Sequence, residues 1–487
     1  MGAATVRGTL QSSSRSSSGA SGRFRWLLVL VGTVVAAGAM VAIPARATYG
    51  AQTTADEPQY LLSALSLWED HDLDISDELA DRRFLAFHDL DLPVQTAVRP
   101  DGSQLSPHDP LLPVLLAVPM GLGGWVAAKL TLAVLAGILA ALLLWVAVRR
   151  FAVPPRIAVP GVALATCTAP LAVYGQQVYP ELPAALAALV AVAALTAPRP
   201  TGRTLSVLAL AVVALPWLSV KYAPVAAALY LVAVAGLWRT HRRPAAGVLT
   251  GVLAAGGIGY LAAHKAIYGG ITAYASGDHF LGSGEFGVVG FHPNYPGGSI
   301  RLLGLLVDRD FGIAAWQPAW FLIVPALVAL LVSRPPHWPV LAAPLLAGWA
   351  TATWVALTMQ GFWWPGRQLV VVLPLAVLVV LVWLARSGRA MVAAAAALAA
   401  AGVAYYAALL VTGYVSSTTW VLAPDDLVLH WPAALMLPDD RDLTVADQVR
   451  YAAWVVITVV VAAVTALLAL RTAGRSGREP AASRTSR

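Results

Sequence analysis

The sequence predicts an all-α, polytopic membrane protein, and three observations support this prediction. Hydrophobic residues make up 59% of the 487 residues and charged residues only 12%, whereas soluble domains are about 45–50% apolar and about 25% charged. Many apolar runs reach the roughly 17–25 residues that a helix needs to cross a bilayer. Basic residues collect between alternate runs, as they do in the cytoplasmic loops of membrane proteins.

About twelve membrane-spanning helices are expected, within a range of about 11 to 13. Apolar runs of sufficient length occupy 24–44, 125–149, 156–174, 179–197, 203–220, 222–238, 244–268, 312–333, 339–358, 366–385, 390–414 and 450–471. The run 110–122 is also apolar, but it is short and is interrupted by Pro113 and Pro119. We expect this run to be re-entrant or interfacial.

The distribution of charge orients these spans. With the N-terminus in the cytoplasm, the cytoplasmic segments hold 20 of the 32 basic residues and, of the 25 acids, only Glu479. Every loop then obeys the positive-inside rule. Both termini are therefore expected in the cytoplasm, and the protein is expected in the plasma membrane.

The two ends of the chain differ in composition from the apolar part. Residues 1–22 are rich in Ser and Gly, and residues 472–487 are basic and polar. We expect both to be disordered cytoplasmic tails, with the membrane domain over 23–471. The first span has an alternative interpretation, because two arginines precede it and "ARA" at 45–47 follows it, as in a cleavable signal peptide.

The expected topology places the large connecting segments on one side. The cytoplasmic loops are short, but the extracytoplasmic face carries 45–124, 269–311 and 415–449. We therefore expect the function to reside on the extracytoplasmic face. Ionisable residues near the membrane are costly and usually functional. Five of them fall near the outer ends of spans and predict a polar cavity there: Lys129, Glu181, Lys221, His264 and Lys265.

The sequence argues against a disulfide, a nucleic-acid partner and the use of a nucleotide. The chain has a single cysteine, Cys167, so an intramolecular disulfide is impossible. The net charge of +7 is explained by the cytoplasmic loops, so nucleic acid is not an expected partner. The cytoplasmic loops contain no P-loop and no GxGxxG motif, which argues against a nucleotide-using enzyme on that face.

The first outer segment begins with "TTADEPQYLLSALSLW", residues 53–68. Asp56 has the pattern of an ordinary helix N-cap, since an acid and a proline follow it. The helix it begins is amphipathic and is expected to lie along the membrane surface. The acidic remainder of the segment is compatible with a divalent-cation site, although no EF-hand spacing is present. His108 and Asp109 precede the short apolar run, where a histidine has either a structural or a functional role.

Six motifs, in order over roughly residues 24–385, carry a resemblance to a known family. They are "TADEPQYLLSALSL", "SPHDPLLPVLLAVPMGLGG", "YPELPAALAALVAVAAL", "LPWLSVKYAPVAAALYL", "LLGLLVDRDFGIAAWQPAWFL" and "MQGFWWPGRQLVVVLPLAVL". Together they resemble the GT-C glycosyltransferases that use polyprenyl-phosphate sugars. These include the protein O-mannosyltransferases, the lipid A aminoarabinose transferases and the bacterial relatives grouped as glycosyltransferase family 39.

The resemblance implies a GT-C-like fold and an inverting transfer of a hexose or pentose on the outer face. The donor would be a sugar on a polyprenyl-phosphate carrier, and the acceptor a glycolipid, a polysaccharide or a protein. By position, the first-loop acid of the family corresponds to Asp56 or Glu57, as general base or as the group that orients the acceptor. Arg367 matches the arginine of the late motif, although "WPGR" inverts the usual Gly-Pro order.

The implied chemistry also suggests substrate-binding residues. The leaving lipid phosphate needs cations and hydrogen-bond donors, for which the candidates are His108, Lys221, Arg301, Arg309 and Arg367. The aromatic residues of "GFWW", including Trp363 and Trp364, either contact sugar or lipid or belong to an interfacial aromatic belt. No cofactor is assigned beyond the divalent cation with which the acidic segment is compatible.

Two other functions remain open from the sequence. A carrier or flippase for polyprenyl lipids would need the same outer cavity and cations, but not Asp56 as a base. An envelope assembly protein would use the outer segments to bind other proteins, and no single outer carboxylate would then matter. Neither the sugar nor the acceptor is determined by the sequence.

Overall fold

The computed structural model describes residues 5–45, 51–92, 95–277, 294–356, 358–361, 363–415, 428–441 and 443–476. Over these residues the protein is all-helical, and extended pairing is limited to two isolated bridges, Asp74 with Leu105 and Thr96 with Gly277. This confirms the predicted all-α class.

Within the described residues, seven helical stretches are long and apolar enough to cross a membrane. They are Gly22–Ala42 in α1 (Thr5–Ala42), Leu111–Arg149 (α4), Val220–Arg239 (η2 Val220–Tyr222 and α9 Ala223–Arg239), Arg243–Ser276 (α10 Arg243–Tyr268 and η3 Ala273–Ser276), Arg367–Leu384 (η8 Arg367–Val372 and α16 Leu373–Leu384), Arg389–Val415 (α17) and Val445–Arg471 in α19 (Val445–Ser476). The protein is therefore a multi-pass membrane protein, and the larger number of twelve spans stays a prediction.

The other expected spans form shorter or broken helices. Three shorter apolar stretches are Glu181–Leu195 (α7), Gly202–Leu218 (α8) and Pro318–Ser333 (η6 Pro318–Leu322 and α14 Ile323–Ser333). The remaining two expected runs contain α5 (Pro155–Thr166) with α6 (Leu171–Tyr174), and α15 (Trp338–Ala350) with the π-helical turn η7 (Thr351–Val355). Prolines inside α5, α8 and α15 remove backbone donors and favour such interruptions.

The run 110–122 becomes the first limb of α4. Gly123 (φ −149°, ψ 19°) and Gly124 (φ 64°, ψ −162°) have non-helical backbone angles and separate this limb from the limb that begins at Trp125. The positive φ of Gly124 lies in a region that glycine adopts readily and other residues rarely do. The two glycines therefore set the angle between the short limb and the long membrane limb.

The first outer segment contains α2 (Glu57–Glu69), α3 (Ser76–Ala80) and η1 (Arg83–Ala86). Residues Glu57 through Ser66 of α2 are all buried, and α2 packs against α4. The helix is thus enclosed by protein along most of its length, whereas the sequence pattern predicted a surface helix. Its buried polar groups are accommodated locally, as where the Ser63 hydroxyl donates to the Gln59 carbonyl at 2.9 Å.

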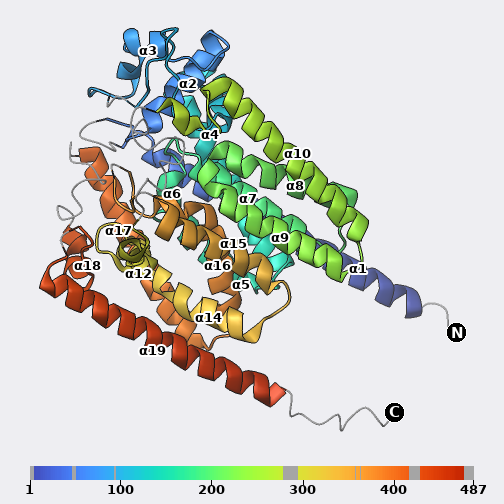
Figure 1. Cartoon of the computed structure of the whole chain (residues 1–487). Coiled ribbons are helices and arrows are strands. Elements are labelled where there is room, and N and C mark those ends of the chain that lie inside the picture. Colours follow the sequence, from blue (N-terminus) through green and yellow to red (C-terminus); the bar gives the residue numbers. More distant parts are fainter. Residues whose placement is uncertain are drawn as a thin grey trace.

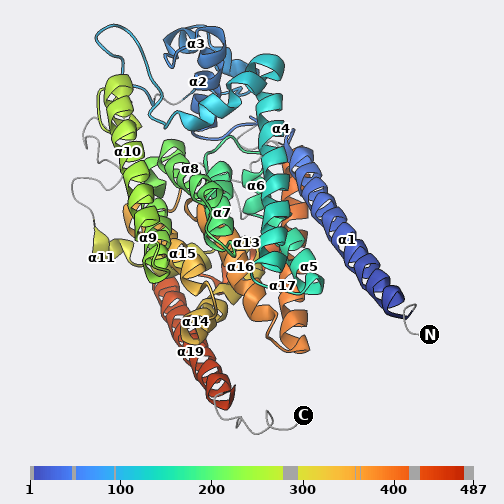
Figure 2. The same ribbon diagram turned by 90° about the vertical axis from the view of Figure 1, so that its right-hand side faces the viewer.

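The helices form one elongated bundle (Figures 1 and 2). The views agree that α2 and α3 lie at one end, and that the start of α1 and the end of α19 lie at the other. The apolar window of Arg367–Leu384 is 83% buried, whereas none of the window in α19 is buried. α16 is therefore central, and α19 presents its apolar side chains outward, as a lipid-facing helix does.

Several short helices lie between the longer ones in the second half of the chain. They are α11 (Tyr295–Gly298), α12 (Arg301–Val307), α13 (Ile313–Trp316), η10 (Val428–His430) and α18 (Trp431–Met436). Residues 1–4 and 477–487, at the ends of the two expected tails, lie outside the described residues. α1 covers most of the segment 1–22, whose disorder stays a prediction from its composition.

Candidate functional site

Asp56 occupies the N-cap position of α2, but its side chain does not cap the helix. Its backbone carbonyl accepts hydrogen bonds from the amides of Gln59 (3.0 Å) and Tyr60 (3.3 Å), while its side chain makes no cap hydrogen bond. Instead, Oδ2 of Asp56 accepts a hydrogen bond from the Arg367 guanidinium at 2.7 Å. The carboxylate is thus held on a fixed helix start and directed towards a second element.

Arg367 is placed by the glycine before it. Gly366 has φ +79°, and a Cβ there would lie 2.7 Å from Cγ2 of Ile313. The "PGR" turn therefore needs glycine at this position, and it brings Arg367 to the start of η8. The guanidinium also donates from Nε to Glu181 Oε1 at 2.8 Å, and it lies over the rings of Tyr179 and Trp363, 4.2 and 5.0 Å from their centroids.

Lys221 completes a four-residue cluster, which we call the Arg367 network: Asp56, Glu181, Lys221 and Arg367. The Lys221 ammonium donates to Glu181 Oε1 at 2.7 Å. Two carboxylates thus face two cations, so the charges of the network balance. The side chain of Glu181 is fully buried and that of Arg367 is 7% exposed, whereas that of Asp56 is 18% exposed. The network is therefore most accessible at Asp56.

All four members lie at or just before the start of a helix. Asp56 precedes α2, Glu181 is the first residue of α7, Lys221 lies in the turn before α9, and Arg367 begins the turn before α16. Because helix N-termini carry partial positive charge, their convergence favours negative charge at this place. The helix starts thereby favour the carboxylates of Asp56 and Glu181, which in turn pair with Lys221 and Arg367.

The other oxygen of Asp56 connects to His108. Gln95 donates from Nε2 to Asp56 Oδ1 at 3.4 Å, and its Oε1 lies 3.2 Å from Nε2 of His108. Because an amide oxygen only accepts, this arrangement requires a proton on Nε2 of His108. The His108 ring stacks on Tyr60, with centroids 4.6 Å apart. His108 therefore belongs to the site.

Charge and burial act in opposite directions on these groups. Burial is the largest influence on Asp56 and raises its pKa, but Arg367, His108 and Lys221 together lower the pKa to about 2. Burial also disfavours the charged form of His108 and so lowers its pKa, against the opposing effect of Asp56. Asp56 is therefore ionised and His108 neutral at neutral pH in this state.

Glu57 has a different environment from its neighbour. Its Oε1 accepts from the backbone amide of Thr54 at 2.8 Å, and its Oε2 accepts from the amide of Val178 at 2.7 Å. Oε2 also lies 3.6 Å from the buried ammonium of Lys129. A fully buried carboxylate with these partners ties the start of α2 to α4 and to the turn before α7. The geometry favours Asp56 over Glu57 as the group that meets a substrate.

Several buried polar atoms near these elements have unused hydrogen-bonding capacity. Among the described residues, no hydrogen-bond partner is found for Oε2 of Glu181, the hydroxyl of Tyr222, or the side-chain amide of Gln177. Buried polar atoms are normally hydrogen-bonded. These atoms therefore offer donors and acceptors to a polar ligand or to water.

His264 joins a second buried pair rather than the Arg367 network. Its Nε2 lies 2.9 Å from Oδ1 of Asp109, and its Nδ1 lies 2.9 Å from the Tyr260 carbonyl. Asp109 also accepts from the amide of Val220 at 2.9 Å, next to Lys221. This pair attaches the segment of His108 to α10 and to the turn before α9. Lys265, in contrast, is exposed.

Two of the predicted cationic residues lie in a different place. Arg309 donates to Oδ2 of Asp439 at 2.6 Å, and Arg301 donates to the carbonyl of Ala356 at 2.8 Å. Within the described part of the chain, the ion pairs of Asp56 and Glu181 are made with Arg367 and Lys221 and not with Arg301 or Arg309. The structure thus brings together Asp56, His108, Lys221 and Arg367 of the predicted site, but not Arg301 and Arg309.

The two predicted tryptophans also separate. Trp363 lies beside Arg367, whereas Trp364 is fully buried and packs against Trp316, with centroids 5.0 Å apart. Trp364 is therefore a core residue in this structure. Phe362, between Gly361 and Trp363, lies outside the described residues.

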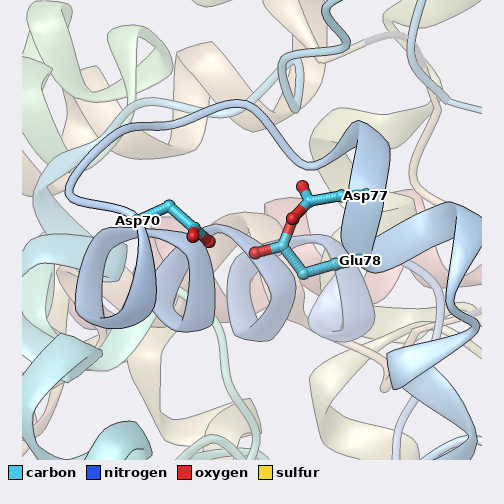
Figure 3. Close-up of side chains that lie close together, drawn as sticks. All are labelled: Asp70, Asp77 and Glu78. Atoms are coloured by element: carbon cyan, nitrogen blue, oxygen red, sulfur yellow. The ribbon is translucent and has the colours of Figure 1, made fainter.

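Sequence reasoning missed some members of the site. Glu181 was recognised as an ionisable residue near a span, but not as the common partner of Lys221 and Arg367. Gln95 carried no signal in the sequence, and Tyr179 was included only as the first residue of one of the six motifs. Within the described residues, the group that could hold a metal ion is the acidic cluster of Asp70, Asp77 and Glu78 in the first outer segment (Figure 3). None of these three residues belongs to the Arg367 network.

Comparison with known proteins identified no relative: no protein-family model, no curated protein and no solved structure matches the chain.

Proposed function

We propose that the protein is a membrane glycosyltransferase that moves a sugar from a polyprenyl-phosphate carrier to an acceptor hydroxyl on the extracytoplasmic face. The observation on which this rests is the Arg367 network. An ionised, part-exposed carboxylate is held 2.7 Å from an arginine beside a lysine. A phosphate-linked donor and a hydroxyl acceptor need these two kinds of group side by side.

The cations suit a phosphate of the donor. Arg367 offers a planar set of donors that matches phosphate. Lys221 adds a second positive charge, since it pairs with Glu181, which Arg367 also contacts. The convergent helix starts favour an anion as well. The unpartnered atoms of Glu181, Gln177 and Tyr222 suit the hydroxyl groups of a sugar.

A donor phosphate would also change the state of Asp56. In the structure Arg367 holds the pKa of Asp56 low, at about 2, against the effect of burial, and such a carboxylate is a weak base because efficient bases have a pKa nearer the working pH. A phosphate that takes hydrogen bonds from Arg367 weakens the Arg367–Asp56 pair. The pKa of Asp56 then rises, so donor binding activates the base.

The transfer step follows from this arrangement. The acceptor oxygen forms a bond to the anomeric carbon of the sugar, and the bond from that carbon to the phosphate oxygen breaks. Polyprenyl phosphate leaves with the bonding electrons, and the hydroxyl proton passes to Asp56. Proton transfer to a positioned base typically contributes about 10²–10⁴-fold to the rate.

The proposal includes a GT-C-like fold with about twelve spans and cytoplasmic termini. It is supported by the position of α2 at the end of the bundle opposite the start of α1 and the end of α19 (Figures 1 and 2). The positive-inside pattern then puts Asp56 on the extracytoplasmic side.

One observation favours a second candidate, a carrier or flippase for polyprenyl lipids. Arg367, His108 and Lys221 hold the pKa of Asp56 low against burial, which makes this carboxylate a weak base. A weak base is no disadvantage if the network only binds and releases a lipid phosphate. In that function Arg367 and Lys221 remain essential, but a neutral residue at position 56 is tolerated.

The test is a transfer assay in membranes that contain the full chain, with polyprenyl-phosphate-linked mannose, arabinose and glucose as donors and total envelope lipid as acceptor. Asp56→Asn is expected to lower transfer by about 10²–10⁴-fold, because asparagine fits the same helix start but cannot take a proton. Asp439→Asn is the matched control, since it removes the ion pair of Asp439 with Arg309, which lies outside the Arg367 network. This variant is expected to leave transfer unchanged.

Retention of transfer by Asp56→Asn would reject Asp56 as the base. Equal losses in both variants would show that the effect is structural. Absence of transfer by the wild-type protein from every donor, with measurable translocation of the carrier lipid, would replace the transferase by the flippase.

A further inference from the structure

Three carboxylates of the first outer segment converge outside the Arg367 network. Asp70 is the C-cap residue of α2, and Asp77 and Glu78 lie in the first turn of α3. One oxygen from each can be chosen so that all three lie within 4.8 Å of one another. Figure 3 shows the carboxyl group of Glu78 between those of Asp70 and Asp77.

Glu78 supplies an independent observation. Its residue is only 2% exposed, yet among the described residues neither oxygen of its carboxyl group has a hydrogen-bond partner outside the cluster, where its neighbour is the carboxyl group of Asp77. A buried carboxylate whose nearest polar neighbour is another carboxylate is costly, because burial and like charge both oppose its ionised form. Because this side chain points into the cluster (Figure 3), a positive ligand between the three groups would remove that cost.

Protein cations do not fill this role. Arg83 pairs with Glu69 through two hydrogen bonds of 2.9 and 3.0 Å, and Arg82 pairs with Asp91 at 3.1 Å. Within the part of the chain that the structure describes, no ion pair involves a carboxylate of the cluster.

The other acids of the loop are used differently. Oδ1 of Asp72 accepts from the Ser66 hydroxyl at 2.9 Å, and Oδ1 of Asp74 accepts from the amides of Ser76 and Gln104 at 3.1 and 2.8 Å. These bonds shape the loop between α2 and α3. They hold Asp70 opposite Asp77 and Glu78 without occupying the cluster.

We propose that Asp70, Asp77 and Glu78 bind a calcium ion. Carboxylate oxygens are hard ligands of the kind that Ca²⁺ and Mg²⁺ prefer, and Ca²⁺ accepts six to eight oxygens in irregular geometry, whereas Mg²⁺ needs a near-ideal octahedron and usually few carboxylates. Asp70 and Asp77 are exposed, so water can complete the coordination. Three carboxylates on two short elements therefore fit Ca²⁺ better.

The ion would join the end of α2 to the start of α3. The start of the same helix carries Asp56, so the ion would fix α2 at the end remote from the Arg367 network. This role is structural and does not depend on the proposed transferase activity.

Tb³⁺, a hard ion that replaces Ca²⁺ and luminesces when excited through a nearby indole, is the probe. The full chain is placed in phosphatidylcholine nanodiscs, because this lipid has no net charge to bind the ion. Trp68 lies two residues before Asp70, within about 7 Å along the chain. We expect saturable luminescence from one Tb³⁺ per chain, displaced by Ca²⁺ with a Kd on the order of 10⁻⁴–10⁻³ M, as in extracellular calcium modules.

Variants locate the ion. Glu78→Gln and the exposed Asp77→Asn are each expected to weaken Ca²⁺ competition by at least about tenfold, because fewer charged ligands remain. Asp89→Asn, an exposed acid outside the cluster, is expected to have no effect. Trp68→Phe is expected to remove most of the luminescence.

Three results would overturn the site. They are no saturable luminescence in the wild-type protein, equal Ca²⁺ competition in wild type and in well-folded Asp77→Asn, or undiminished luminescence in Trp68→Phe. Loss of binding by Asp77→Asn with a normal elution volume on size exclusion supports the site even if Glu78→Gln does not fold.

Discussion

The Arg367 network and the cluster around Arg309 are built from the same kinds of residue. They differ in how deeply the arginine is buried and in how far along the chain its partners lie. The Arg309 cluster consists of Arg309, Asp308, Asp310, Asp439 and Asp440. Its arginine is 26% exposed and pairs with Asp439 at 2.6 Å, whereas Arg367 is 7% exposed and pairs with carboxylates 186 and 311 positions away in the chain.

The two places also treat a carboxylate in opposite ways. Burial raises the pKa of Asp308 to about 7, even though three backbone amides donate to it. At Asp56 burial acts in the same direction, but Arg367 and its neighbours outweigh it and lower the pKa to about 2. The ionised form is thus favoured for Asp56 beside the buried arginine, and the neutral form is favoured by burial for Asp308, to which backbone amides donate.

This difference teaches which arginine can serve a ligand. Arg309 lies in the expected outer segment 269–311 and Arg367 in the "WPGR" motif, and both were candidates for the phosphate. Only Arg367 lies at a convergence of helix starts with a second cation on the same carboxylate. The three predictions below break or sharpen this comparison.

The largest effect is expected from removing the two arginines in turn. Arg367→Gln leaves Asp56 and Glu181 without their common partner in a buried place, which is expected to cost about 3–5 kcal/mol in the free energy of unfolding. Arg309→Gln removes a more exposed pair and is expected to cost about 1 kcal/mol. Thermal unfolding in detergent, followed by tryptophan fluorescence, measures both. Equal losses would break the comparison.

An intermediate effect is expected from pH. The pKa of Asp308 is raised from the ordinary aspartate value of 3.8 to about 7 in the folded protein, because burial disfavours its charged form. Between these values the folded state binds more protons than the unfolded state, so stability falls as pH rises from about 4 to about 7, by up to about 1.4 kcal/mol per pH unit. Asp308→Asn is expected to flatten this slope in unfolding measured across pH 4–8.

The Arg367 network has the opposite sign. Because the pKa of Asp56 is lowered to about 2 by its cations against burial, its contribution to stability is present above pH 4 and is lost as pH falls towards 2. A wild-type protein whose stability did not change from pH 4 to 7 would contradict the difference between Asp56 and Asp308.

The smallest effect is expected at Arg301. Arg301→Ala removes its hydrogen bond to the Ala356 carbonyl, which is expected to cost about 1 kcal/mol and to leave sugar transfer unchanged. The same membrane transfer assay measures this, with Arg367→Gln as the inactive reference. A loss of transfer by Arg301→Ala would place Arg301 in the site and so correct the comparison.

Much of the architecture could be predicted without the structure because it depends on local properties. The length and apolarity of a run determine whether it forms a membrane helix, and the acid and proline after Asp56 mark a helix start that the structure has at Glu57. The same reasoning located Lys221 near the end of a span, whereas Arg367 was predicted from the resemblance of the late motif. It failed for α2, where a pattern of the kind found on surface helices is enclosed by α4 and its neighbours.

Only the tertiary structure determined which groups the charged side chains pair with. Adjacent carboxylates are equivalent in sequence, yet Glu57 binds Lys129 and two backbone amides while Asp56 binds Arg367. Glu181 became the common partner of two cations, and Arg309 was drawn to Asp439 instead. Helix formation follows from the local sequence, whereas these pairings depend on how distant helices pack, so their ion pairs and pKa values are properties of the assembled bundle.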